Sequence, residues 1–185
     1  MRIAITGAHG VGKSTLAERL GRILDLPELP TPGRILAARG LPVNQSATIS
    51  SQTVAWLLQY RLEREQPAWV APRSLIDVWA YAVLAADRNR SDPLEQMMVA
   101  ELAAATPLAM AGAYDELVLI PVGVPLVADD VRSADEGFQH STDAAIQRAL
   151  ADWDVPHTRL DVRDSEAVEA LIDRLARRQA NAGQQ

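Results

Sequence analysis

Apolar and polar positions follow two recurring patterns along the chain: short apolar runs, and longer segments whose apolar residues recur every three or four positions. Short apolar runs predict strands, and they occupy residues 2–6, 25–30, 67–72, 116–121 and 155–160. Helical spacing predicts helices that begin at Thr15, Ser74 and Ser165, and others over residues 34–39, 47–65, 91–105 and 141–150. Alternating strands and helices favour a parallel sheet covered on both faces. The predicted fold is therefore an α/β three-layer sandwich with a central five-stranded parallel sheet.

Two of these elements carry further expectations. The run 25–30 holds two prolines, which cannot donate to a strand ladder, so this strand is predicted at an edge of the sheet. The long helix over 47–65 is expected to turn its periodic apolar residues toward the core. These residues are Val54, Leu57, Leu58 and Leu62.

The remaining segments are predicted as connections. Residues 107–112 begin with a proline and are expected to link a helix to the strand at 116–121. The polar stretch 123–138 predicts a lid-like loop. No repeat or linker divides the chain, so residues 1–185 are expected to form a single domain.

A glycine-rich stretch, Gly7–Thr15, separates the first strand from the first helix. It fits the phosphate-binding loop pattern of a glycine, four residues and then Gly-Lys-Ser/Thr. Glycines let backbone N–H groups approach an anion closely, and the start of a helix favours negative charge. Lys13, the only lysine of the chain, is expected to contact the outer phosphates, and Ser14 to ligate magnesium. The predicted nucleotide-binding residues are Gly7, His9, Gly10, Val11, Gly12, Lys13, Ser14 and Thr15.

Composition narrows the classes that could use such a loop. The net charge of -6 argues against nucleic acid or an anionic membrane as a partner. Cysteine is absent and the three histidines have no ligand spacing, so a zinc site is not expected. No apolar run could span a bilayer and the N-terminal strand does not have the pattern of a signal peptide, so we expect a cytoplasmic protein.

Two other classes of phosphate-loop protein lack their signatures. A GTPase needs Asn-Lys-x-Asp after a strand, whereas the nearest match, residues 89–92, lacks the lysine and falls between two helices. Motor ATPases end a hydrophobic strand in Asp-Glu, but Asp115 and Glu116 precede theirs. A kinase that uses ATP and Mg²⁺ is the class left by this comparison.

Three segments carry a family resemblance: the phosphate loop, Arg73–Tyr81 (RSLIDVWAY) and Asp129–Ser133 (DDVRS). They resemble the small P-loop kinases related to nucleoside and nucleotide kinases. The chain is similar in particular to the ribosylnicotinamide-kinase-like domain of bacterial NAD-synthesis regulators. The resemblance spans most of the chain, although only the phosphate loop is highly specific. It implies ATP-dependent phosphoryl transfer to a small nucleoside or nucleotide acceptor.

The resemblance and the strand ends together suggest residue roles. Lys13, Arg73 and Arg132 are the candidate catalytic residues: Arg73 follows a strand near the loop, and Arg132 lies on the arginine-bearing lid. The resemblance implies that Gln52 could read a base edge. The alternatives are arginines in surface pairs, a solvated glutamine and aromatic residues that pack the core. The candidate substrate-binding residues are Arg34, Gln52, Trp56 and Asp77.

Two departures from the resembled group weaken the kinase assignment. Pro72 stands where that group has a magnesium-holding aspartate, and residues 30–33 (PTPG) lack its carboxylate base. Glu28 and Asp77 could substitute for these missing carboxylates, but neither lies at the expected place. A carboxylate of Asp77, Asp129 or Asp130 could reach magnesium through water.

An acceptor that is already a phosphate needs no base. The departures therefore favour a phosphate acceptor, or a weak kinase.

Three alternatives stay open at this point. One is an ATP- or ADP-binding regulatory protein, or a weak ATPase, without efficient kinase activity. Another is a kinase acting on modified bases in DNA, which the acidic balance disfavours. A possible homodimer could form through the apolar helix around Met97 and Met98.

Overall fold

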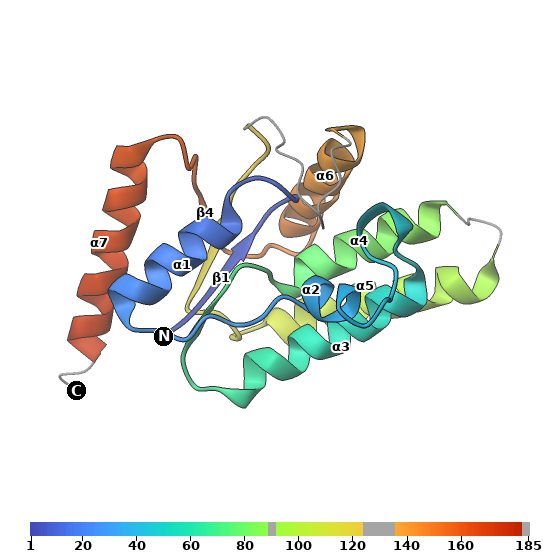
Figure 1. Cartoon of the computed structure of the whole chain (residues 1–185), viewed down its shortest axis with the longest axis horizontal. Helices are drawn as coiled ribbons and strands as arrows, with labels where there is room; N and C mark the ends of the chain where they lie inside the picture. Colours follow the sequence, from blue (N-terminus) through green and yellow to red (C-terminus); the bar gives the residue numbers. More distant parts are fainter. Residues whose placement is uncertain (89–91, 124–135, 183–185) are drawn as a thin grey trace.

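A parallel β-sheet lies at the centre of the protein (Figure 1). The computed structural model describes residues 1–88, 92–123 and 136–182. The sheet has four strands in the order β2-β1-β3-β4. They are β1 (Arg2–Thr6), β2 (Trp69–Ala71), β3 (Glu116–Leu119) and β4 (Thr158–Arg159). The prediction of a parallel sheet is confirmed.

The fifth predicted strand is reduced to a single parallel bridge between Glu28 and Val70 at the β2 edge. Leu29 donates its N–H to the Val70 carbonyl at 2.9 Å, and Val70 donates to the Pro27 carbonyl at 3.0 Å. Pro27 and Pro30 have no N–H, so the ladder cannot extend in either direction. Residues 25–30 therefore lie at the predicted edge, but the count of five strands was wrong for the described residues.

The helices follow the predicted order. They are α1 (Lys13–Leu24), α2 (Pro32–Ala37), the 3-10 helix η1 (Asn44–Ser46), α3 (Ile49–Glu65), α4 (Leu75–Asp87), α5 (Pro93–Met110), α6 (Glu136–Asp152) and α7 (Ser165–Ala182).

Two helix boundaries differ from the prediction by five residues, and the other predicted boundaries differ by two residues or fewer. Helix α5 continues through Pro107 to Met110, because contacts such as the hydrogen bond from Arg64 to the Ala109 carbonyl at 2.9 Å hold its last turn. Helix α6 begins at Glu136, five residues before the predicted cap, so residues 136–138 are helical. The rest of the predicted lid, 124–135, lies outside the described residues.

Two hydrophobic cores lie on opposite faces of the sheet. Ile3, Ile5 and Val70 pack with α1 and α7, whereas Ala4 and Trp69 pack with the layer formed by α2 to α6. Successive strand residues point to opposite faces, so β1, β2 and β3 each contribute to both cores. Figure 1 shows the resulting layers, with α1 and α7 on one side of the strands and the other helices across from them. The predicted three-layer arrangement is confirmed.

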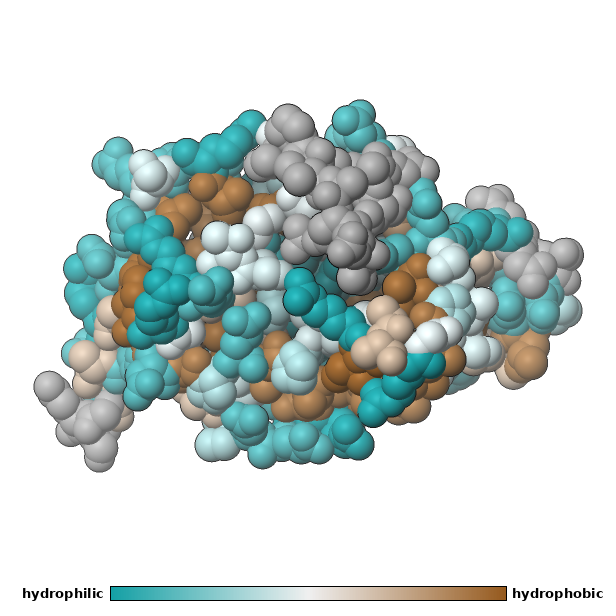
Figure 2. Space-filling model, in the orientation of Figure 1, coloured by the Kyte–Doolittle hydropathy of each residue, from teal (hydrophilic) through white to brown (hydrophobic). Residues whose placement is uncertain are grey.

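Helix α3 buries only part of the predicted face: Leu58 and Leu62 pack against the core, whereas Val54 and Leu57 do not. Leu57 is 56% exposed and Val54 44% exposed, and Figure 2 shows apolar surface over this helix. The buried residues of α3 include four polar ones, Ser51, Gln52, Gln59 and Glu63. Apolar spacing misidentified part of the face because polar residues, including the hydrogen-bonded pair Gln59 and Glu63, occupy positions on the buried side.

No helix among the described residues combines the length and apolar character needed to cross a bilayer.

Apolar side chains are exposed at the N-terminal end of α5, where Leu94 is 59% and Met97 57% exposed. Met98 packs against the core.

The orientation of α3 can be tested by identical substitutions at two leucines. We expect Leu57→Ala to change the free energy of unfolding by less than about 0.5 kcal/mol, because the side chain is exposed. Leu20→Ala should cost about 2–5 kcal/mol, because Leu20 is fully buried. Urea unfolding measures both values. A cost at Leu57 as large as that at Leu20 would contradict this orientation.

Candidate functional site

The phosphate loop leaves β1 and passes very close to the end of β3. Gly7 has a φ of +145°, and a Cβ added there would lie 2.3 Å from the Ile120 carbonyl oxygen. Gly12 has a φ of +95° and directly precedes α1. Only glycine meets both demands without strain. The glycines of the motif therefore shape the loop and bring it over the sheet.

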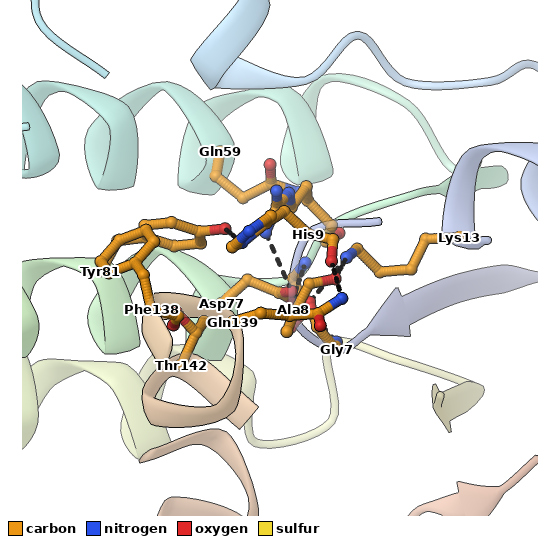
Figure 3. A network of polar contacts seen from close by, with 12 residues as sticks. Gly7, Ala8, His9, Lys13, Gln59, Asp77, Tyr81, Phe138, Gln139 and Thr142 are labelled. Atoms are coloured by element: carbon orange, nitrogen blue, oxygen red, sulfur yellow. Dashed lines mark hydrogen bonds and ion pairs between the residues drawn. The ribbon is translucent and has the colours of Figure 1, made fainter. Parts of the chain in front are cut away.

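Lys13 lies inside this loop and is 5% exposed. Its Nζ donates to the Gly7 carbonyl at 2.6 Å and also to the Ala8 carbonyl (Figure 3). These contacts hold the positive charge within the curve of the loop. The sequence predicted this lysine as the phosphate-contacting residue, and its burial in the loop is consistent with that role.

A fully buried carboxylate lies beneath the loop. Asp77 Oδ1 accepts a hydrogen bond from the Gly7 N–H at 3.1 Å and from an Arg73 Nη at 3.4 Å. Its Oδ2 accepts from the N–H and the hydroxyl of Ser74 at 2.9 and 2.8 Å. Both oxygens are therefore occupied, and Asp77 fixes the start of α4 to the loop. Asp77 does not line the pocket described below, so the structure does not place it as predicted, at the substrate.

The tip of the loop is held by residues that sequence reasoning missed. The Tyr81 hydroxyl lies 3.3 Å from His9 Nδ1, and the His9 ring lies 5.6 Å from that of Phe138. Gln139 Nε2 donates to the His9 carbonyl at 2.8 Å, as Figure 3 shows. Helices α4 and α6 thus both contact the loop. No spacing signal could have shown this, because the partners are about 70 and 130 residues away.

A pocket opens beside the loop at the carboxyl ends of the strands. Several predicted site residues line it together, namely His9, Gly10, Gly12, Lys13, Ser14, Arg34, Gln52 and Arg73. Other residues complete the lining, among them Thr31, Asn44, Ala55, Val78 and Tyr81. Ligands of open parallel sheets bind at this edge. The structure therefore brings the loop, Arg73 and two of the four predicted substrate-binding residues, Arg34 and Gln52, to one cavity.

Other predicted residues lie elsewhere. Trp56 is 7% exposed, and its Nε1 donates to the Thr106 hydroxyl on α5 at 3.0 Å. It stacks on Tyr60 with ring centroids 5.4 Å apart. Trp56 is thus a core residue between α3 and α5, as the alternative reading of the aromatic residues held. Arg132 lies outside the described residues.

Few groups of the described chain could hold magnesium. Ser14 is half-buried and lines the pocket beside Lys13. Among residues 1–88, 92–123 and 136–182, no cluster of three or more histidine, aspartate or glutamate side chains is placed to bind a metal ion. Glu28 is exposed and does not line the pocket. Asp129 and Asp130 lie outside the described residues.

A second buried carboxylate supports the backbone that carries Arg73. Gln59 Nε2 donates to Glu63 Oε1 at 2.8 Å and to the Arg73 carbonyl at 3.1 Å. The Tyr114 hydroxyl donates to Glu63 at 3.0 Å and accepts from the Leu75 N–H at 3.3 Å.

Burial raises the pKa of Glu63 from its ordinary 4.5 to about 7, although the hydrogen bonds from Gln59 and Tyr114 oppose the shift. The signal for this network in the sequence is a glutamine and a glutamate four residues apart on one helix.

The sequence model of the AAA domain family matches residues 2–167, and the chain therefore belongs to this family. A search of curated proteins finds no match.

Solved structures with a similar fold include a NadR protein in complex with NAD and AMP-PNP, 18% identical with a TM-score of 0.65. That match covers 97% of this chain and 49% of NadR, so this chain spans about half of that protein. Deoxyadenosine kinase from M. mycoides with bound dATP is 16% identical, with a TM-score of 0.67 and coverage of 95% and 98%. Shikimate kinase from Aquifex aeolicus is 16% identical, with a TM-score of 0.53 and coverage of 98% of both chains. The chain therefore has a P-loop nucleoside or nucleotide kinase-like fold, as its motifs predicted.

The role of Asp77 is testable by removing its charge and keeping its shape. We expect Asp77→Asn to lower the free energy of unfolding by about 1–3 kcal/mol, because an amide cannot accept all four hydrogen bonds. Nucleotide affinity should fall as well, since the amide joins the loop to the start of α4 through fewer accepted hydrogen bonds. Urea unfolding and nucleotide titration measure the two effects. Asp173→Asn, on the exposed side of α7, is the matched control, and equal behaviour of the two variants would refute the role.

The raised pKa of Glu63 predicts a pH dependence of stability. The folded state favours the neutral acid, so the contribution is present below about pH 4.5 and is lost as the pH rises through about 7. This change amounts to roughly 3 kcal/mol. We expect Glu63→Gln to remove it from unfolding curves measured between pH 4.5 and 7.5. Glu65→Gln, exposed on the same helix, should keep the wild-type pH dependence, and a Glu63→Gln variant that also keeps it would contradict the assignment.

Proposed function

We propose that the protein is a kinase that transfers the γ-phosphoryl group of ATP to a small nucleoside or nucleotide. The observation that carries the proposal is the single pocket that holds both Lys13 and Ser14 of the phosphate loop and Arg34 and Gln52 of the facing elements. A loop that binds only a nucleotide needs no second set of polar groups in the same cavity. The kinase-like fold supports the same class.

ATP and Mg²⁺ are the proposed cofactors, and the loop offers groups that fit them. The loop backbone and the Lys13 ammonium would hold the outer phosphates, with the Gly10 and Gly12 backbone able to approach closely. Ser14 would supply the protein ligand to magnesium, whose other ligands would be phosphate oxygens and water. When bound, the metal neutralises charge on the transferred group.

Arg73 is the proposed cation between donor and acceptor. Its guanidinium contacts Asp77 and lies 5.1 Å from the centre of the Tyr81 ring. Burial lowers its pKa, but Tyr81 and Asp77 more than offset this, so the pKa is raised and the group stays charged. A fixed planar cation suits phosphoryl transfer, in which charge spreads over the phosphoryl oxygens. Arg132 keeps its proposed role as the lid cation from the family resemblance.

Gln52 is the proposed reader of the acceptor base. It is 7% exposed and lines the pocket, and its side-chain amide makes no hydrogen bond to another described residue. An amide can donate and accept at once, so a ligand with both kinds of group would bind it through two hydrogen bonds. Ala55 and Val78 provide apolar lining nearby. This combination is suited to a heterocyclic base.

A second function, nucleotide binding without efficient turnover, has one observation in its favour. No aspartate or glutamate is among the described residues that line the pocket. Such a protein would bind ATP or ADP and report its occupancy to a partner.

A cytoplasmic location and a homodimer both stay predictions from the sequence.

Removal of the loop ammonium tests the proposed kinase. We expect Lys13→Ala to lower kcat by roughly 100- to 1,000-fold, because the transferred charge loses its cation. Turnover with ATP, Mg²⁺ and a panel of nucleosides and monophosphates is the measurement. Arg22→Ala, an exposed cation on the same helix, is the control and should leave kcat unchanged. An unchanged rate in Lys13→Ala would contradict the assigned role, and tight ATP binding without turnover on any acceptor would favour the second function.

A further inference from the structure

We propose that the acceptor in this pocket carries a phosphate of its own, as a nucleoside monophosphate does, and that this phosphate receives the transferred group. The inference rests on the proposed kinase function and specifies its substrate class. It begins with a contrast in charge. The chain as a whole carries a net charge of -6, yet the formally charged residues among the described lining residues are Lys13, Arg34 and Arg73. A cavity with one sign of charge concentrates ligands of the opposite sign.

The carboxylates closest to this region are unsuited to act as a base. Asp77 is completely buried beneath the loop, and each of its oxygens already accepts hydrogen bonds. Glu63 is 4% exposed and is held by Gln59 and Tyr114. Glu28 is exposed and is not part of the pocket lining. A hydroxyl acceptor must lose a proton as it attacks, and no carboxylate of the described lining could take it.

The three cations follow three neighbouring segments of the sheet. Lys13 follows β1, Arg73 follows β2, and Arg34 follows the segment that bridges to β2 at the edge. The spatial order is residues 25–30, then β2, then β1. Because β2 is in the middle, Arg73 comes between Arg34 and Lys13 in this order. The donor phosphates belong at Lys13. The two arginines are then left for the acceptor side.

Both arginines have donors that an acceptor phosphate could use. Arg34 is exposed and forms no ion pair within the described part of the chain. Arg73 contacts Asp77 through one nitrogen, at 3.4 Å, which leaves other N–H groups of its guanidinium for a ligand. A guanidinium binds phosphate through two parallel hydrogen bonds. An uncharged nucleoside would leave the remaining N–H groups of both arginines without an anionic acceptor.

The chemistry of such an acceptor matches what the pocket offers. An oxygen of the acceptor phosphate forms a bond to the γ-phosphorus of ATP, while the bond from that phosphorus to the β,γ-bridging oxygen breaks. The electron pair leaves with ADP, and the products are ADP and a nucleoside diphosphate. The attacking oxygen is already ionised, so no proton has to be removed. The arginines offset the repulsion between the two anionic phosphates.

The test compares matched acceptor pairs. The full chain with ATP and Mg²⁺ is given each common nucleoside and its 5′-monophosphate, and products are quantified by chromatography. We expect kcat/KM for the best monophosphate to exceed that for its nucleoside by about 100-fold or more, because a site built for a charged group rejects the analogue that lacks it. Arg34→Gln should raise the KM for the monophosphate about 10-fold and leave the KM for ATP unchanged. Arg39→Gln, an exposed arginine just beyond α2, is the control and should change neither.

The outcomes separate the two proposals. Phosphorylation of nucleosides with an equal or higher kcat/KM would overturn the phosphate acceptor and leave the kinase function standing. If ATP binds and no acceptor is turned over, the kinase function fails, and calorimetric titration of monophosphates in the presence of AMP-PNP decides the acceptor site. Binding that Arg34→Gln weakens would support the anionic site. Binding that is absent, or unaffected by Arg34→Gln, would overturn it.

Discussion

The hydrogen bond from the Gly7 N–H to the buried Asp77 carboxylate joins the phosphate loop to the first turn of α4, next to Arg73. It connects a loop near the N-terminus to a helix 70 residues later in the sequence. A buried carboxylate is costly unless donors surround it, and here the loop, Ser74 and Arg73 supply them. Its place in the first turn of α4 adds the favourable field of a helix N-terminus. The loop conformation and the position of Arg73 are therefore set by one charge.

A second group of buried polar residues, centred on Glu63, supports the hydrogen bonds around Asp77. Glu63, through Gln59 and Tyr114, holds the backbone on both sides of Ser74. The acidic groups near the site thus lie below the pocket, whereas its described charged lining is cationic. This separation leaves cations as the described charged groups of the lining, while Asp77 engages one nitrogen of Arg73 from below. It also explains how an acidic protein can present a positively charged cavity.

Several features of the site were predictable because they depend on local sequence. The glycine pattern of the loop requires positive φ angles and close backbone approach, which Gly7 and Gly12 provide in the structure. Arg34 and Arg73 were identified because residues that follow parallel strands gather at one edge. Other features were missed or wrong because they depend on distant partners. Trp56 packs against Thr106 rather than a ligand, and α3 buries polar residues that apolar spacing could not indicate.

The sequence alone determined the α/β class, the parallel sheet, the phosphate loop and the kinase resemblance, because periodicity and glycine spacing are properties of neighbouring residues. Tertiary structure decided which carboxylates are engaged, which face of α3 is buried, and that the described pocket lining includes three cations and no acid. It also reduced the proline-containing edge strand to one bridge. These outcomes depend on which residues from distant segments meet in space. Hydrogen-bond satisfaction and burial, rather than local pattern, decide them.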